Sequence, residues 1–231
     1  MHYTALQHAK LFFQVYGAGR ENAVIAEIGS QDVNGSLRQV APPTCKYIGL
    51  DFAAGRGVDL IMQDPYTMPL GTGTVDLVVS SSCFEHAEFF WLTFLETLRI
   101  LKDDGLVYIN IPSNGFYHRF PTDSWRFYPD AGLALNRWAL RNGYNSTLME
   151  SFIGAQHDQD VWNDFVCVVL KDRRFAAKYP IRMHPLAVNP TNIHINDEDA
   201  ATNSQPVPQD VRRCRYLVMA LNTILNNVAK A

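Results

Sequence analysis

Two histidines and two acidic residues occupy positions from which they could move protons. Glu85 and His86 follow one apolar, β-rich run of the sequence, and His118 and Asp123 follow the next. An imidazole titrates near neutral pH, so a histidine can take a proton from a substrate under working conditions. A carboxylate beside the ring can orient it. The sequence therefore predicts general-base chemistry, with His118 or His86 as the base and Asp123 as the orienting group.

The connection that carries His118 is rich in aromatic side chains. It holds six aromatic residues within residues 114–128, together with two arginines. Long connections of such composition are uncommon in compact domains and are often functional. Aromatic faces with interspersed polar groups suit a sugar ring or a flat organic acceptor, and an arginine can bind a carboxylate or phosphate. The predicted substrate-binding residues are Asn114, Tyr117, Trp125 and Arg126.

A structural alternative exists for both histidines. The aromatic residues can simply pack the edge of the domain and leave His118 at the surface. His86 can serve as a residue that begins a helix and holds the loop.

A second polar group follows the first two predicted strands. Glu27, Gly29 and Ser30 stand where the first strand ends. A glycine there lets the backbone turn tightly and approach a ligand, and the glutamate can accept hydrogen bonds or attract a cation. Asp51 ends the next strand, 22 residues after Gly29, where a carboxylate suits the two hydroxyls of a ribose. This combination favours a cofactor that contains adenosine.

Seven short apolar runs alternate with helical stretches and must position these residues. The predicted helices span 4–16, 35–40, 87–102 and 129–142, and the predicted strands span 23–29, 46–51, 57–62, 75–82, 105–113, 147–154 and 161–171. Near-continuous apolar strands alternating with helices are typical of a parallel sheet covered on both faces. No helix separates the last two runs, which indicates an antiparallel hairpin.

The composition changes after about residue 172. Residues 183–209 hold four prolines and an acidic run, so we expect residues 1–172 to form one domain and residues 173–209 an extended linker. Residues 210–231 read as an amphipathic helix whose apolar stripe must be buried on its own domain or on a partner. A homodimer through this helix is one expected outcome.

Several segments, taken in order, resemble the class I S-adenosylmethionine-dependent methyltransferases, in particular their bacterial small-molecule and glycan-associated group. They are AEIGS, YIGLD, VDLVVSSSCFEH and LRILKDDGLVYINIPS, within residues 22–171. The stretch 110–130 looks like a subgroup signature associated with saccharide biosynthesis. The resemblance implies an α/β fold: a Rossmann-like, doubly wound, seven-stranded sheet with an antiparallel last strand, in a three-layer sandwich.

The resemblance also implies roles for individual residues. Glu27 is expected near the methionine amino group, with close backbone approach at Gly29. Asp51 is expected at the ribose hydroxyls and Asp64 at the adenine amino group, although Asp64 precedes a proline and can equally begin a turn. The remaining expected cofactor contacts are Ser30, Phe52, Ser81 and Ser82, and Phe52 would stack on adenine unless it packs in the core.

The first motif departs from the family pattern. Gln31 and Val33 stand at the second and third places where the family often has glycines, and Gly35 comes later. The loop is therefore expected to follow a different path around the methionine end of the cofactor.

Charge and composition exclude several other functions. The 20 basic and 23 acidic side chains give a net charge of −3, which offers no electrostatic footprint for nucleic acid or an anionic membrane. The four cysteines are widely spaced without a CxxC motif, so we expect reduced thiols and no metal site. The sequence shows neither a signal pattern nor a transmembrane run, and the expected location is the cytoplasm.

These observations predict an S-adenosylmethionine-dependent methyltransferase (EC 2.1.1.-) that methylates a small molecule or saccharide intermediate at oxygen. One alternative is a nicotinamide-dependent Rossmann oxidoreductase, which would not explain the missing G-x-G-x-x-G pattern or the antiparallel hairpin. The other is a non-catalytic binding module on the same fold, which the irregular first motif leaves open.

Overall fold

Eight strands form one mixed sheet in the computed structural model, which describes residues 2–157 and 160–228. Their order across the sheet is β3-β2-β1-β4-β5-β7-β6-β8. The strands are β1 (Val24–Ile28), β2 (Lys46–Asp51), β3 (Leu60–Ile61), β4 (Val75–Ser81), β5 (Leu101–Pro112), β6 (Thr147–Ile153), β7 (Asp164–Leu170) and β8 (Thr191–Ile195). The helical elements are α1 (Tyr3–Tyr16), η1 (Leu37–Gln39), α2 (Phe90–Ile100), α3 (Ala131–Arg141), η2 (Arg173–Lys178), η3 (His184–Leu186) and α4 (Gln209–Val228).

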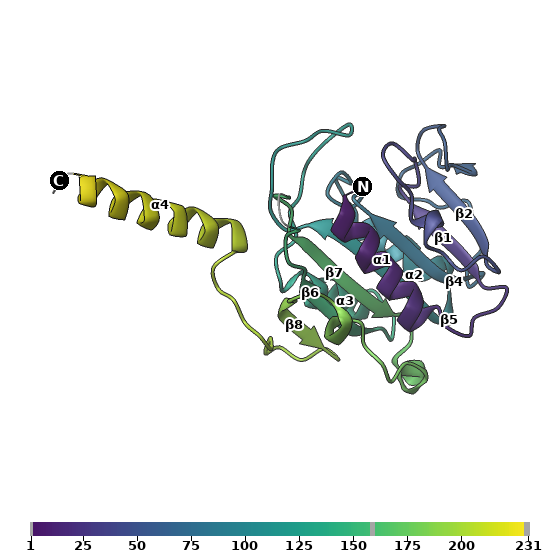
Figure 1. The fold of residues 1–231 in the computed structure, drawn as a ribbon. Helices are drawn as coiled ribbons and strands as arrows, with labels where there is room; N and C mark the ends of the chain where they lie inside the picture. Colours follow the sequence, from purple (N-terminus) through teal and green to yellow (C-terminus); the bar gives the residue numbers. More distant parts are fainter. Residues whose placement is uncertain (1, 158–159, 229–231) are drawn as a thin grey trace.

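Alternation along the strands divides the core into two layers. In β5, Val107 and Ile109 face a core shared with α2 and α3, whereas Leu106 and Tyr108 face a core shared with α1. Figure 1 shows α1 lying across the near face of the sheet. The predicted three-layer α/β architecture is therefore confirmed.

The predicted terminal hairpin is also present. Strand β7 lies between β5 and β6 and runs antiparallel to both, while β1 to β5 pair in parallel. The carboxyl ends of β1, β2, β4 and β5 consequently meet at one edge of the sheet, where the predicted site residues follow them.

The expected seven strands were one too few, and the expected linker was wrong over part of its length. Residues 173–209 contain η2, η3 and β8, and β8 pairs antiparallel with β6. The Asp197 carboxylate fixes this segment: it accepts hydrogen bonds from Leu148 N (2.7 Å), Asn136 Nδ2 (2.7 Å) and Thr147 Oγ1 (2.9 Å). A polar, proline-rich segment looks like a linker in sequence because these hydrogen bonds, rather than apolar periodicity, attach it.

Buried carboxylates attach the surrounding elements to β6 and β7. Glu150 accepts hydrogen bonds from Tyr16 Oη (2.5 Å) in α1 and from the backbone nitrogen of Met183 (2.7 Å). Asp164 accepts hydrogen bonds from Thr4 Oγ1 (2.6 Å) and His2 Nε2 (2.7 Å). The start of α1 is thereby held beside the first residue of β7.

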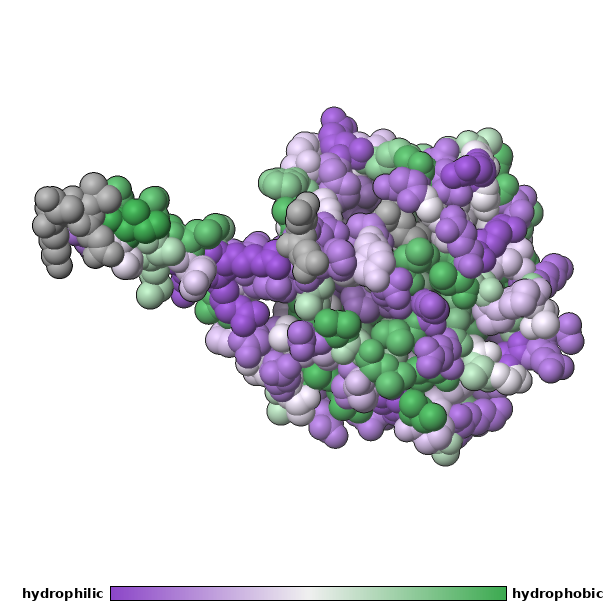
Figure 2. Space-filling model, in the orientation of Figure 1, coloured by the Kyte–Doolittle hydropathy of each residue, from purple (hydrophilic) through white to green (hydrophobic). Residues whose placement is uncertain are grey.

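Helix α4 projects away from the body of the molecule (Figure 1). Its large apolar side chains are exposed, including Leu217, Leu221 and Ile224, and green apolar atoms of this helix face solvent in Figure 2. Among the described residues, no helix combines the length and apolar character needed to span a bilayer.

Candidate active site

A cavity of about 500 Å³ opens at the carboxyl edge of the parallel strands. Its wall includes residues that follow β1, β2 and β4, together with part of the loop after β5. Nine predicted site residues line it: Glu27, Gly29, Ser30, Asp51, Phe52, Ser81, Ser82, His86 and His118. The fold thus brings the predicted cofactor end and the predicted proton-transfer end into one space.

Glu27 lies in the cavity wall and is almost completely buried. Its Oε2 accepts hydrogen bonds from Tyr47 Oη (2.9 Å) and Ser36 Oγ (3.4 Å). Burial raises the pKa of Glu27 to about 7 against the opposing effect of these hydrogen bonds. A cationic group bound at this carboxyl would favour its ionised form.

Gly29 sits where the β1 loop meets the residue two positions beyond β4. Its φ is +75°, and an added Cβ would lie 2.6 Å from both Cβ and Sγ of Cys83. An L-residue at position 29 would therefore suffer both backbone strain and a steric clash. The cavity floor depends on this close packing, and burial raises the pKa of the Cys83 thiol to about 12.

Two buried hydroxyls in the wall have no hydrogen-bond partner within the described protein. They are Oγ of Ser30 and Oγ of Ser81. Buried polar groups are normally satisfied, and both of these belong to residues that line the cavity, so the wall is suited to a polar ligand. A nucleoside with an amino acid side arm would fit this donor and acceptor set.

Asp51 and Phe52 extend this wall beyond β2. Asp51 Oδ2 accepts a hydrogen bond from Gln31 N (3.1 Å), and its Oδ1 accepts one from Ala53 N (3.2 Å). The Phe52 ring is 49% exposed, so it does not pack in the core and is free to contact a ligand. The carboxylate thus also fixes the β1 loop, which reaches it without the family's second and third glycines.

Asp64 lies outside the residues that line the cavity. Its carboxylate accepts hydrogen bonds from Tyr66 N (3.0 Å) and Thr67 Oγ1 (2.9 Å). The structure therefore gives Asp64 the turn-forming role that its position before a proline allowed. Met62 and Tyr66, which flank it, line the cavity instead.

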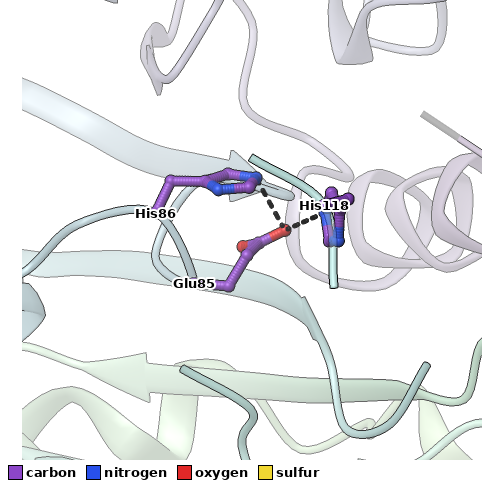
Figure 3. Close-up of side chains that lie close together, drawn as sticks. All are labelled: Glu85, His86 and His118. Carbon is purple, nitrogen blue, oxygen red and sulfur yellow. Dashed lines mark ion pairs between the residues drawn. The ribbon is translucent and has the colours of Figure 1, made fainter. Parts of the chain in front are cut away.

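Glu85, His86 and His118 converge at the other end of the cavity (Figure 3). His86 Nε2 is 3.6 Å from Glu85 Oε1, and His118 Nε2 is 4.0 Å from the same oxygen. Burial raises the pKa of Glu85 to about 8, and burial lowers the pKa of His86.

The loop after β5 is tied down directly over this cluster. The carbonyl of Glu85 accepts hydrogen bonds from the backbone nitrogens of Ser124 (2.8 Å) and Trp125 (3.1 Å), and Thr122 Oγ1 donates to the carbonyl of His86 (2.6 Å). Gly115, at φ +102°, allows the Trp162 ring to pack where a Cβ would lie, 2.0 Å from the ring. Trp162 in turn packs against the His118 ring, with centroids 5.0 Å apart.

Asp123 does not orient the His118 ring as predicted. Its carboxylate accepts hydrogen bonds from Arg126 Nη1 (2.5 Å) and from the backbone nitrogen of His118 (2.7 Å), while the ring Nδ1 is 3.6 Å away. The Arg126 guanidinium lowers the pKa of Asp123 to about 2. The groups nearest to the ring Nδ1 are instead the carbonyl of Phe116 at 3.1 Å and Arg126 Nη2 at 3.4 Å.

The four predicted substrate-binding residues do not line the cavity. Asn114 pairs with Asn163, Trp125 donates to the carbonyl of Glu88, Arg126 is bound to Asp123, and Tyr117 is exposed. The residues from this side that line the cavity beside His118 include His2, Arg119, Phe120, Pro121, Thr122 and Trp162. Aromatic content located the loop correctly but could not tell which of its faces points inward.

Residues 17–109 match the family model described as a methyltransferase domain. No curated protein shows significant sequence similarity to this chain. Among solved structures, the chain resembles the Burkholderia thailandensis 1,6-didemethyltoxoflavin-N1-methyltransferase, solved with S-adenosylhomocysteine (TM-score 0.54, 12% identity, 73% of this chain and 78% of that one). It also resembles a putative methyltransferase solved with the Haloferax volcanii Trm112 methyltransferase activator (TM-score 0.54, 17% identity, 74% and 91%).

The chain has the class I methyltransferase fold. Both structures match this chain with a TM-score of 0.54 over nearly three quarters of its length. The family model matches residues 17–109, a segment that contains β1 to β5 except the last three residues of β5. The [4+2]-cyclase SpnF also resembles the chain (TM-score 0.54, 10% identity, 72% and 81%), so the fold alone does not fix the reaction.

Proposed function

We propose that this protein transfers a methyl group from S-adenosylmethionine to a hydroxyl of a small molecule or saccharide intermediate. The observation that carries the proposal is that one cavity is lined by Glu27 and Asp51 at one end and by His86 and His118 at the other. When bound, the cofactor supplies a methyl group on a positively charged sulfur, which leaves as a neutral thioether.

At the cofactor end of the cavity, polar groups of four residues bind S-adenosylmethionine. Glu27 receives the methionine amino group, Asp51 receives the ribose hydroxyls, and Ser30 and Ser81 donate or accept the hydrogen bonds that their buried hydroxyls lack. The exposed Phe52 ring stacks on the adenine. Ser82 completes this wall beside Ser81.

The acceptor end activates a hydroxyl through His118. We assign to His118 the tautomer that donates from Nδ1 to the carbonyl of Phe116, which leaves the lone pair at Nε2. Nε2 accepts the proton of the acceptor hydroxyl, and Phe120 and Trp162 provide apolar surface for a sugar ring. Asp123 and Arg126 are positioning residues that hold the His118 loop.

The rival functions differ in which small molecule stabilises the protein. Thermal unfolding of the full chain is measured with S-adenosylmethionine, S-adenosylhomocysteine and the nicotinamide cofactors. We expect stabilisation by the first two only. Stabilisation by a nicotinamide cofactor alone would overturn the proposal in favour of an oxidoreductase. No stabilisation by millimolar ligand would favour a non-catalytic module.

We further propose that α4 pairs with α4 of a second copy. Cys214, Leu217, Leu221 and Ile224 alternate at spacings of three and four residues, which is the seam of a two-stranded coiled coil. The apolar members of this seam are more than half exposed, and most helical stability in proteins comes from packing of such an amphipathic face. The free state of Cys45, Cys83, Cys167 and Cys214 supports a reducing compartment, which we propose is the cytoplasm.

A further inference from the structure

We propose that Glu85, His86 and His118 form a binding site for a divalent transition-metal ion of the zinc type. One atom from each residue lies within 4.8 Å of the other two. Two imidazoles and one carboxylate are a ligand set that zinc and similar first-row metals accept. The sequence predicted no metal, because these residues belong to two separate loops and have no ligand-like spacing.

Both histidines are held with a nitrogen lone pair toward the same point. We assign to each ring the tautomer with its proton on Nδ1, since this nitrogen faces the carbonyl of Thr122 in His86 and lies 3.1 Å from the carbonyl of Phe116 in His118, where Arg126 Nη2 is farther away at 3.4 Å. In each ring Nε2 is therefore unprotonated when the imidazole is neutral. Metal-binding histidines almost always have a hydrogen bond of this kind at the other ring nitrogen, because it fixes the tautomer and the orientation.

The Glu85 carboxylate is a second, independent indication of a metal site. Its side chain is fully buried, and neither Oε1 nor Oε2 has a hydrogen-bond partner among the described residues. Buried carboxylates without hydrogen bonds are costly, and they are usually paired or bound to a metal. Figure 3 shows this carboxylate pointing toward the two imidazoles.

The distances are close to those of a metal site. Ligand atoms around a tetrahedral zinc ion, at bonds of about 2.1 Å, are about 3.4 Å apart. The Glu85 oxygen is already 3.6 Å from His86 Nε2 and 4.0 Å from His118 Nε2. Small side-chain rotations would close the site without moving the loop, which is already bound to the Glu85 backbone.

Three protein ligands leave the fourth coordination position of a tetrahedral ion open. This position faces the cavity, because His86 and His118 line the cavity. This arrangement suits an oxygen of the acceptor, so the inference deepens the proposed function and rests on it for this part only. In the loaded protein the His118 lone pair holds the ion. A bound ion would lower the pKa of the acceptor hydroxyl, whose proton would pass to water in the cavity instead of to the His118 imidazole.

Metal binding by the full chain tests the site without any acceptor. Chelator-treated protein is titrated with Co²⁺ and Zn²⁺ by calorimetry, and Co²⁺ coordination is followed by visible absorption. We expect one ion per chain, with Zn²⁺ displacing Co²⁺ and excess Mg²⁺ failing to do so, since Mg²⁺ prefers oxygen ligands.

Matched variants identify the ligands. His118→Ala, His86→Ala and Glu85→Gln should each weaken binding by at least about 100-fold, whereas the exposed His157→Ala should not change it. Far-ultraviolet circular dichroism and S-adenosylhomocysteine binding check that each variant is folded. Wild-type binding no tighter than that of His118→Ala would overturn the metal site. Failure of cofactor binding with intact metal binding would overturn only the proposed function.

Discussion

Glu27 and Asp51 both line the cavity, but their carboxyl groups accept hydrogen bonds from different sets of donors. Asp51 accepts hydrogen bonds from backbone nitrogens of Gln31 and Ala53, so it also holds the loop. Glu27 accepts hydrogen bonds from the hydroxyls of Tyr47 and Ser36 and from the backbone of Leu37, and burial nevertheless raises its pKa to about 7. Near neutral pH, Glu27 is the cofactor-end carboxyl whose charge depends on what is bound beside it.

Glu27→Gln should lower affinity for S-adenosylmethionine about tenfold or more, because it removes a hydrogen bond to a charged group. In the wild type, binding of the cationic amino group should release a proton, since the neutral form of Glu27 is populated below about pH 7. Affinity should rise with pH from 6 to 8. Calorimetry at several pH values measures this slope, and an unchanged slope in Glu27→Gln would contradict the assignment.

The exposed Glu21→Gln is the matched control for that measurement. It removes the same charge from the chain away from the cavity wall. We expect its affinity and its pH slope to equal those of the wild type.

His118→Ala should lower turnover by about 100-fold or more, with little change in cofactor affinity, because general-base catalysis contributes on that order. Asp123→Ala should also lower turnover, by releasing Arg126 and the backbone of His118. Turnover and cofactor binding are measured separately, once an acceptor is in hand. Full activity in both variants would show that this loop does not activate the acceptor.

At the scale of elements, Asp164 joins α1 to β7. Burial alone would raise its pKa, but hydrogen bonds from His2 and His8 outweigh burial and lower it. Burial would likewise lower the pKa of His2, and the hydrogen bond to Asp164 outweighs it and raises that pKa. The pair therefore contributes stability above the ordinary pKa of the aspartate, 3.8, and below that of the histidine, 6.5.

Asp164→Asn should destabilise the fold by about 3 kcal/mol between pH 4 and 6.5, since it breaks a buried ion pair. The difference from the wild type should shrink as pH falls through the lowered pKa of Asp164. It should also shrink as pH rises through the raised pKa of His2. Urea unfolding at acidic, intermediate and alkaline pH measures the difference, with exposed Asp103→Asn as the control. A constant difference across this range would be inconsistent with the pair.

The strands and helices whose apolar residues recur with a regular period could be predicted from the sequence. The run around Leu106 to Ile111 alternates between the two cores, and the stripe of α2 faces one of them. Strand β8 could not be predicted, because Asp197 attaches it through side-chain hydrogen bonds that leave no periodic signal. The partner of Asp123 could not be predicted either, because its pairing with Arg126 depends on the path of the loop.

The candidate site was predictable at its strand ends and not in its loops. Residues at the carboxyl end of a parallel strand must lie at one edge of the sheet, so Glu27 near the end of β1, Asp51 at the end of β2 and Ser81 at the end of β4 reached the cavity. Loop residues have no such constraint. Tyr117 consequently points to solvent, while Trp162, which arrives from the connection before β7, closes the cavity.

For the whole molecule, the proposed pairing of α4 with α4 of a second copy predicts a dimer. Leu217→Asp and Leu221→Asp should convert a dimer to a monomer, because each places a charge in the apolar seam. Light scattering after gel filtration measures the mass. Exposed Asn222→Asp is the control on the same helix, and a wild-type monomer at micromolar concentration would refute the pairing.

Cys214 provides an internal test of helix orientation. It is exposed, and it occupies a seam position that would face its own copy in a parallel pair. Mild oxidation should then link two chains through Cys214, and Cys214→Ser should abolish the link. Absence of the link in a dimer would indicate an antiparallel pair or another interface.

The contact between Gly29 and Cys83 couples the identities of two residues that are far apart in the chain. Since an added Cβ would meet Cys83, position 29 could accept alanine only if position 83 became smaller, and the positive φ would still strain it. Cys83→Gly should therefore rescue only part of the damage caused by Gly29→Ala. A designer who wishes to reshape this part of the wall must therefore change the loop after β1 and the residues beyond β4 together, because a side chain at position 29 fits only beside a smaller residue at position 83.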